Sequence, residues 1–170
     1  MLLDVINLDK VRRGILYTLI MFLVLAAQEI VLSRITIFGV RAMIVPIFPV
    51  AVGLLQGGMW GMGFGLACGI LCDTMFAENL VMFTILLPCL GFLATAAERF
   101  LISRKLVAFF AASTAALAVT AIAQVMRTFL LFNAEMIPML RVAGLQVLYS
   151  IPFIFPLYYP CRALSERALD

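Results

Sequence analysis

The sequence contains no histidine, and only 12% of its 170 residues are charged. Histidine is the commonest general base and a frequent metal ligand, so its absence removes the usual centre of acid–base catalysis and of mixed zinc sites. Neither Ser113 nor Ser150 lies in a nucleophile-elbow pattern, and the glycine-rich stretch lacks the Lys-Ser/Thr ending of a phosphate-binding loop. We therefore expect a protein that is not an enzyme and that carries no cofactor or metal.

The scarcity of charge also argues against a soluble domain, in which roughly 25% of residues are charged. Here 65% of the residues are hydrophobic, and the mean hydropathy is +1.17. Apolar runs repeat along the chain and leave no stretch for a separate soluble domain. The composition predicts an all-α integral membrane protein with one domain over residues 1–170. No small-residue cleavage site follows the first apolar run, so we expect that run to be a retained span and not a signal peptide.

Six apolar segments predict a bundle of six transmembrane helices. A helix rises about 1.5 Å per residue, so about 20 residues cross roughly 30 Å of hydrocarbon. The run from residue 42 to residue 76 is too long for one span, and we expect a hairpin of two short helices that turns at Gln56, Gly57 and Gly58. The predicted spans cover residues 14–32, 42–55, 59–76, 80–97, 106–132 and 142–159.

The basic residues predict the orientation of this bundle. With six spans, eight of the twelve basic residues lie on the side of the two termini, three lie on the opposite side, and Arg127 falls within a span. The positive-inside rule then places both termini in the cytoplasm. The basic residues form no continuous patch, so we do not expect nucleic-acid binding.

The cysteines are expected to be buried thiols that pack as small hydrophobic side chains. All four lie within or beside apolar runs, where this interpretation is favoured over a disulfide or a metal site. They are Cys68, Cys72, Cys89 and Cys161.

A glycine repeat is the most distinctive pattern in the sequence. Four glycines are spaced four residues apart and are followed, after another four, by Asp73. Residues four apart share a helix face, and in a bilayer such a groove lets another helix approach closely. We expect a helix-packing or partner-binding groove at Gly57, Gly61, Gly65 and Gly69. A second small-residue stripe, at Ala108, Ala112 and Ala116 in the fifth span, is a candidate partner for it.

Several polar residues fall within the predicted spans. Charged groups at membrane depth are costly and are usually paired or face a cavity. Glu29, Asp73, Gln124 and Arg127 fall at similar predicted depth, and one hypothesis is that Asp73 or Glu29 pairs with Arg127. The alternative, which the sequence leaves open, is that these groups snorkel to the interface or cap a loop.

The order of these features resembles the MreD family of rod-shape-determining membrane proteins. The resemblance is carried by Gln28 late in the first span, a short second span at 46–56, and the glycine-rich helix that ends in Gly65-Leu66-Ala67-Cys68-Gly69-Ile70-Leu71-Cys72-Asp73. It implies a non-catalytic component of the cell-elongation machinery in the bacterial inner membrane. Such a protein would bind MreC directly and would help to link MreB filaments to RodA and its transpeptidase, which synthesise peptidoglycan.

A second interpretation comes from a different class. The substrate-binding S subunits of energy-coupling-factor vitamin transporters are also small six-helix membrane proteins, and glycine-rich helices occur among them. Such a subunit needs a pocket at the outer side in which several polar groups lie among apolar walls. The predicted outer loops are short and offer few polar side chains, but they do not exclude this alternative.

Overall fold

A computed structural model gives the fold of the protein. It describes residues 2–32, 34, 36–37, 40–75, 82–100, 105–132 and 136–166. Glu78 and Asn79, which the sequence predicts to form a polar turn between the third and fourth spans, lie outside the described residues. Across the described residues the protein is helical, apart from a few extended residues between the first two long elements.

The first helix, α1, covers Leu2–Ala26 and continues as a wider π-helical turn, η1, at Ala27–Leu32. Two strands of two residues follow, β1 at Thr36–Ile37 and β2 at Val40–Arg41, and they pair antiparallel. Beyond them residues 42–46 contain no regular helix and lead directly into α2. This short extended passage is fully buried from Ala42 to Pro46.

Two short helices follow and form a hairpin. Helix α2 covers Ile47–Gln56, and α3 covers Gly58–Met75. Every residue from Ile47 to Leu54 is buried, so α2 is enclosed and lies at the centre of the protein, where it contacts α3, α4, α5 and α7. A helix that is apolar on all sides is suited to such an enclosed position.

The second half of the chain contains the longer helices. Helix α4 covers Met82–Phe100, and α5 covers Lys105–Phe132. Helix α6, Met136–Ser150, passes through a short 3₁₀ turn, η2, at Ile151–Phe153 and continues as α7, Ile154–Glu166. Pro152 lies in that turn, where its missing amide interrupts the regular hydrogen bonding of the helix.

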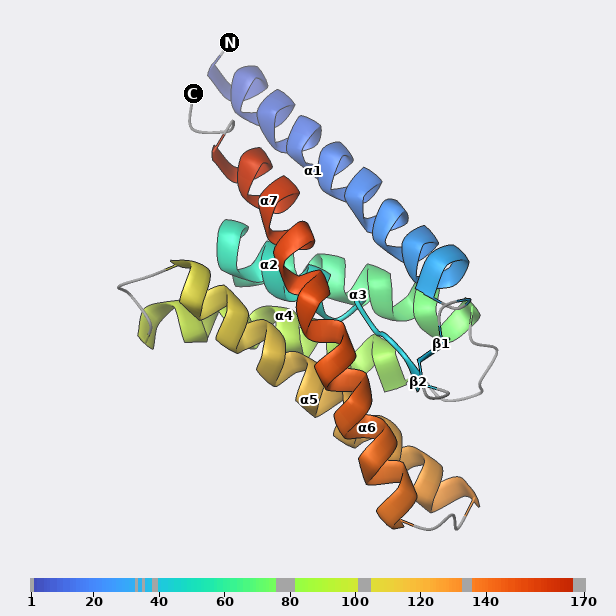
Figure 1. Ribbon diagram of the computed structural model, residues 1–170. Helices are drawn as coiled ribbons and strands as arrows, with labels where there is room; N and C mark the ends of the chain where they lie inside the picture. Colours follow the sequence, from blue (N-terminus) through green and yellow to red (C-terminus); the bar gives the residue numbers. More distant parts are fainter. Residues whose placement is uncertain are drawn as a thin grey trace.

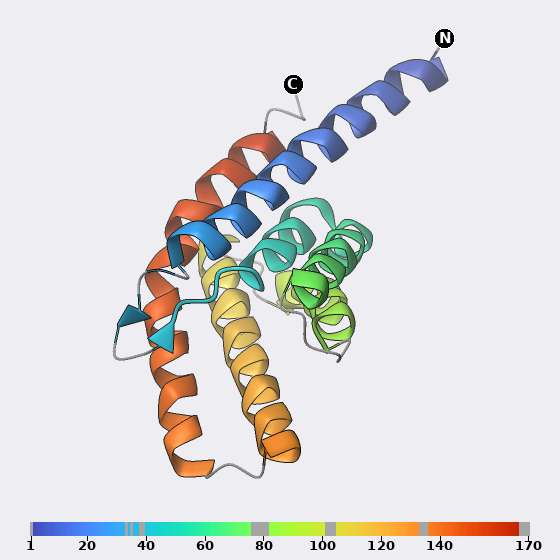
Figure 2. The ribbon, with the colours of Figure 1, turned by 90° about the vertical axis from the view of Figure 1, so that its right-hand side faces the viewer.

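Figures 1 and 2 show how these helices are arranged. The start of α1 and the end of α7 lie at the same end of the molecule, and α5 and α6 meet at the opposite end (Figures 1 and 2). Helices α2, α3 and α4 form a group that lies across the long helices. Tyr17 of α1 donates a hydrogen bond to the carbonyl oxygen of Cys161 in α7 at 3.3 Å, which ties the first and last helices together.

Each of the six predicted segments overlaps a helix of the structure, in the predicted order. Residues 42–46 of the second segment, predicted to be helical, form no regular helix, and the sixth segment, 142–159, crosses α6, η2 and α7. Three stretches are long and apolar enough to cross a membrane, namely Lys10–Ile30, Leu106–Leu130 and Ile137–Ser165. The described part of α2 is too short for this, and the glycines and Asp73 lower the hydropathy of α3. The protein therefore has the character of a membrane protein, and the predicted hairpin at Gly57 is present.

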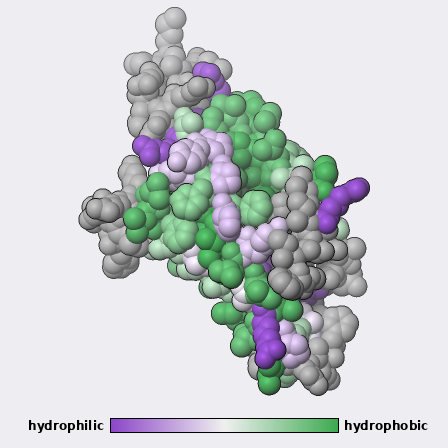
Figure 3. All heavy atoms as spheres, in the orientation of Figure 1, coloured by the Kyte–Doolittle hydropathy of each residue, from purple (hydrophilic) through white to green (hydrophobic). Residues whose placement is uncertain are grey.

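The surface agrees with this character. Large apolar side chains are exposed along α1, α5 and α6, for example Leu23 at 65% and Leu130 at 70% exposure. In Figure 3 the strongly hydrophilic residues lie at the periphery of the visible face, and apolar residues cover most of the area between them. Exposed apolar area on this scale is rare in soluble proteins and is expected where a helix faces lipid.

Candidate functional site

The glycine helix α3 packs against the backbone of α4 and α2. A methyl group on Gly61 would lie 2.5 Å from the Cα of Gly53 in α2 and 2.6 Å from the carbonyl oxygen of Gly91 in α4. A methyl group on Gly53 or on Gly91 would collide with the backbone of the facing helix in the same way. These three glycines form a triple contact, which we call the glycine junction, where three helices approach with no side chain between them.

The contact continues along α3 in both remaining glycine positions of the repeat. A methyl group on Gly65 would lie 2.7 Å from the carbonyl oxygen of Leu87, and one on Gly69 would lie 2.5 Å from that of Phe83. As the position on α3 advances by four residues, the contact on α4 moves back by four. Helices α3 and α4 therefore run antiparallel and remain in backbone contact over more than two turns.

The stripe at Ala108, Ala112 and Ala116 does not occupy this groove, so the proposed pairing of the two small-residue stripes is wrong. Helix α4 lies on the glycines instead. Ala108 and Ala116 are nevertheless buried, and Ala112 is half-buried, in a helix that contacts α2, α4, α6 and α7. The sequence spacing identified two small-residue faces but could not tell which helix each one meets.

Gly57 also differs from the expectation. It lies between α2 and α3 with a backbone φ of +99°, and a methyl group there would meet nothing within 4 Å. Its amide donates to the carbonyl oxygen of Gly53 at 3.1 Å and closes α2. Gly57 is therefore a turn residue whose positive φ favours glycine, and not a packing position of the groove.

Asp73 caps the helix that fills the groove. One carboxylate oxygen accepts the amide N–H of Phe83 at 3.2 Å, and the other accepts the amide and the hydroxyl of Thr84 at 2.8 and 2.7 Å. The first amides of a helix have no partner within it, and a carboxylate there also interacts favourably with the helix dipole. Asp73 thus fastens the end of α3 to the beginning of α4.

Gln28 holds the buried extended passage. Its side-chain amide donates to the carbonyl oxygen of Ala42 at 2.9 Å, and its side-chain oxygen accepts the amide of Ile44 at 2.9 Å. The amide between them, on Met43, donates to the hydroxyl of Ser150 at 2.9 Å. Buried backbone groups outside helices need such partners, and here two side chains supply them. We call this arrangement the Gln28 clasp.

Among the residues on which the resemblance rests, Gln28, Gly65, Gly69 and Asp73 each join two segments of the chain.

No family model, curated protein or solved structure matches the chain.

Sequence reasoning missed Ser150 and assigned Gln28 no specific partner. Ser150 is completely buried, and its hydroxyl donates to the carbonyl oxygen of Gln146 while it accepts from Met43. A serine within an apolar span, just before Ile151 and Pro152, was the available signal, but nothing in the sequence indicates that it faces residue 43. The pairing becomes visible only when the buried extended passage is placed beside the end of α6.

A small, mainly apolar pocket lies between α5 and α6. Its volume is about 270 Å³, and three polar side chains project among its apolar walls, those of Gln124, Thr128 and Gln146. The side-chain amide of Gln124 also lies 3.0 Å from the sulfur of Met43, next to the Gln28 clasp. Small-molecule sites usually occupy about 300 to 1,000 Å³, so this pocket lies just below that range.

The hypothesised ion pair within the membrane stays a prediction. Glu29 is exposed on η1, Arg127 is half-buried on α5, and both oxygens of Asp73 are used by the start of α4. For Asp73 the capping alternative describes the observed geometry. The structure brings Gln124 to Met43, rather than to a carboxylate.

The cysteines are free thiols, and three of them are buried as expected. Cys68, Cys72 and Cys161 lie in the core, whereas Cys89 on α4 is exposed, so the expectation of burial is wrong for Cys89. Cys89 lies one residue after Pro88, which faces α3, and so points away from the glycine contact. Within the described residues, no group of three potential metal ligands is gathered.

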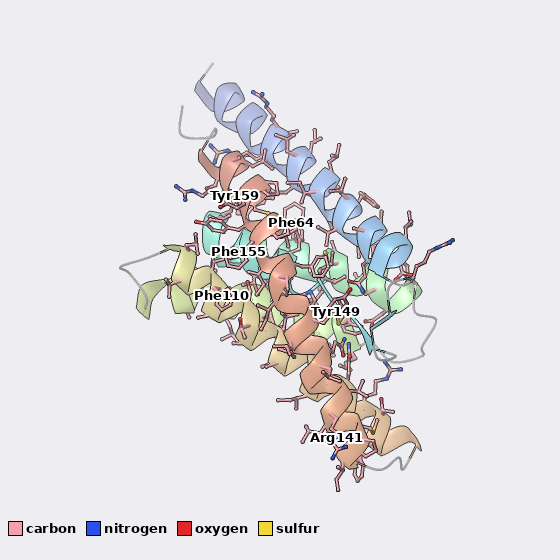
Figure 4. All side chains as sticks on the ribbon, in the orientation of Figure 1. Phe64, Phe110, Arg141, Tyr149, Phe155 and Tyr159 are labelled. Carbon is pink, nitrogen blue, oxygen red and sulfur yellow. The ribbon has the colours of Figure 1, made fainter. Side chains whose placement is uncertain are left out.

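Aromatic side chains complete the packing between the long helices. Phe64 of α3 lies 5.9 Å from Tyr17 and 6.0 Å from Phe48, measured between ring centroids. Phe110 of α5 and Phe155 of α7 lie 5.9 Å apart (Figure 4). The hydroxyl of Tyr17 also accepts a hydrogen bond from the side chain of Gln56, so the end of α2 is anchored near α1.

Proposed function

We propose that the chain is a non-catalytic membrane scaffold similar to MreD. In this role it binds MreC and helps to couple MreB filaments to peptidoglycan synthesis by RodA and its transpeptidase in the bacterial inner membrane. One observation supports the proposal. Gln28, the glycine helix α3 and Asp73 connect successive segments of the chain, from the passage at residues 42–46 to the start of α4. Residues whose order resembles that of MreD thus have a shared structural task, although a fold alone does not define a function.

The proposal includes six membrane spans with both termini in the cytoplasm. Gln56 donates to Tyr17 of α1, and Ser165 of α7 donates to the carbonyl oxygen of Leu55 at 3.4 Å. These bonds bring the turn at Gly57 close to Tyr17 in α1 and to the end of α7, which supports its assignment to the side of the two termini. A chain that returns to this end at Gly57 fits the predicted alternation of spans, and the excess of basic residues fits a cytoplasmic location of that end.

The scaffold must bind its partner elsewhere than in the glycine groove, because α4 fills the groove. Two apolar helix faces are exposed in its place. One is on α1, where Ile15, Leu19 and Phe22 are exposed, and the other is on α5, where Ile122 and Met126 are exposed. In a membrane such faces can meet either lipid or the single transmembrane helix of MreC.

Photo-crosslinking with co-purification tests this proposal. A photoreactive amino acid would be placed at Leu19 on α1, at Ile122 on α5, and at the buried Leu117 as the matched control. We expect MreC to co-purify with the protein and to be crosslinked from Leu19 or Ile122, but not from Leu117. Absence of MreC from the purified complex, with the protein correctly folded by circular dichroism, would refute the scaffold function.

The pocket between α5 and α6 favours one second candidate, a substrate-binding S subunit of a vitamin transporter. Its polar side chains, Gln124, Thr128 and Gln146, are of the kind that orient a small ligand within apolar walls. Saturable vitamin binding by the purified protein, lost in Gln124→Leu and in Gln146→Leu, would support this function. Equal binding by the wild type and both variants would assign the signal to nonspecific partitioning into detergent.

A further inference from the structure

A shallow, open apolar groove runs along the face of α3 that is not covered by α4. It has a volume of about 400 Å³ and is lined by Met59, Trp60, Gly63, Phe64 and Ala67. Gly63 and Ala67, the smallest lining residues, form its floor. The space above Gly63 is open, since a methyl group there would meet nothing within 4 Å. The rings of Trp60 and Phe64 stack at a centroid distance of 6.0 Å and form its wall. We call this feature the α3 groove.

The length and the apolar lining of the groove suit a hydrocarbon chain. Met59, Gly63 and Ala67 are four residues apart, so the groove extends along two turns, or about 12 Å. A face of small residues can also receive a partner helix, so the charge near one end of the groove decides between the two occupants. A single acyl chain can lie lengthwise over Gly63 and against the aromatic rings, with its phosphate beyond the end of the groove.

One end of the groove lies beside the basic part of α1. Gly14 approaches the ring of Trp60, and a methyl group on Gly14 would lie 3.9 Å from it. Lys10 is one turn before Gly14 on the same helix face and is exposed, whereas Arg12, also exposed, is on the opposite face. The exposed charge of Lys10 therefore lies on α1 about one turn beyond Gly14, the residue that approaches Trp60 at the end of the groove. Tryptophan is enriched at this level of a membrane, where apolar and polar regions meet.

We propose that the α3 groove binds one acyl chain of an anionic phospholipid, whose phosphate contacts Lys10. The chain would lie over Gly63 and Ala67 and against Trp60 and Phe64. A basic residue beside an anionic lipid surface favours binding by about fivefold. This inference does not depend on MreC or on the proposed scaffold function, because the site is built by α1 and α3 of this chain alone.

The experiment uses Trp60, which is the single tryptophan of the protein. Lipids with brominated acyl chains quench tryptophan fluorescence on contact. The full-length protein would be reconstituted in phosphatidylcholine vesicles that contain either brominated phosphatidylglycerol or brominated phosphatidylcholine at the same mole fraction. We expect quenching to saturate at a lower fraction of the anionic lipid, with a preference of about fivefold over the zwitterionic lipid.

Three variants make the test specific. Lys10→Gln should abolish the anionic preference, and Arg12→Gln, which removes an equal charge from the opposite face, should retain it. Gly63→Leu fills the floor of the groove and should reduce quenching by both lipids. Gly144→Leu is its matched control, because Gly144 also has nothing within 4 Å of an added methyl group. Circular dichroism would establish that each variant is folded.

Three results would overturn the proposal. Equal quenching by the two lipids would indicate ordinary boundary lipid. Equal loss of the preference in Lys10→Gln and Arg12→Gln would indicate general attraction of anionic lipid to a basic protein surface. Absence of quenching by either lipid would show that the groove is closed to lipid, as it would be if a protein helix covered it.

Discussion

Replacing a single hydrogen in the glycine junction should destabilise the protein more than the same change elsewhere on the same helix. In Gly61→Ala the new methyl group would lie 2.6 Å from the carbonyl oxygen of Gly91 and 2.5 Å from the Cα of Gly53. Both atoms belong to backbone, so no side chain can rotate away, and α3 must separate from α2 and α4. In Gly63→Ala the methyl group meets nothing within 4 Å.

The magnitude follows from two opposing effects. Alanine in place of glycine within a helix stabilises by about 0.5 to 1 kcal/mol, and this gain should appear in full in Gly63→Ala. Overpacking of a close contact costs about 1 to 3 kcal/mol, and this cost falls only on Gly61→Ala. Both positions lie inside α3, so the helix gain applies to both variants and cancels. The two variants should therefore differ by about 1 to 3 kcal/mol in the free energy of unfolding, with Gly61→Ala the less stable.

The assay is unfolding of the purified protein in mixed micelles with an increasing mole fraction of sodium dodecyl sulfate. Fluorescence of Trp60 reports the transition at α3 directly, and far-ultraviolet circular dichroism reports the overall helix content. Equal midpoints for Gly61→Ala and Gly63→Ala would refute the backbone contact between α3 and α4. A matching loss in Gly91→Ala would locate the contact on both helices.

Three further predictions concern the other joints. Asp73→Ala should lower the free energy of unfolding by about 1 to 2 kcal/mol, because the cap of α4 is lost. Asp73→Asn keeps one acceptor oxygen and should be destabilised less. Equal stability of the wild type and both variants would contradict the cap. Gln28→Leu should lower the free energy of unfolding by about 2 to 4 kcal/mol, because two buried backbone groups lose their partners. Gln124→Leu removes only a weak contact to sulfur and should lower it by less than about 1 kcal/mol. The reverse order in chemical unfolding would rule out the Gln28 clasp. N-ethylmaleimide should label Cys89 first in the folded protein, and the other three thiols only after unfolding, as counted by mass spectrometry; persistence of the early label in Cys89→Ser would disprove this assignment.

The order of the helices could be predicted from the sequence because apolar runs and punctuating residues are local signals. Their bounds could not, since α1 begins at Leu2 instead of residue 14 and α2 at Ile47 instead of residue 42. The turn at Gly57 is an example, since Gln56-Gly57-Gly58 interrupts a run too long for one helix. Close approach at Gly61, Gly65 and Gly69 was likewise accessible from their spacing. Membrane character followed directly from the low charge content.

The partners of these residues could not be predicted, because they depend on how helices pack. Spacing showed that the glycines need a close neighbour, but Gly91 in α4 is a lone glycine with no repeat of its own. The small residues of α5 formed a more regular stripe and so attracted the wrong pairing. The same limit applies to Asp73, where depth in the membrane suggested an ion pair and the structure shows a cap made by backbone amides of the next helix.

The Gln28 clasp has a consequence for the order in which the chain can be completed. The amide of Met43 and the hydroxyl of Ser150 are separated by 107 positions in the sequence. A ribosome has therefore delivered nearly the whole protein before the third bond of this passage has its acceptor. Until α6 arrives, one polar backbone group near the start of α2 must remain hydrated or be shielded by another protein. The packing near the start of α2 is thus completed only after Ser150 has been synthesised. A chain truncated before Ser150 should be recognised and degraded by membrane quality control, even though every earlier helix is intact.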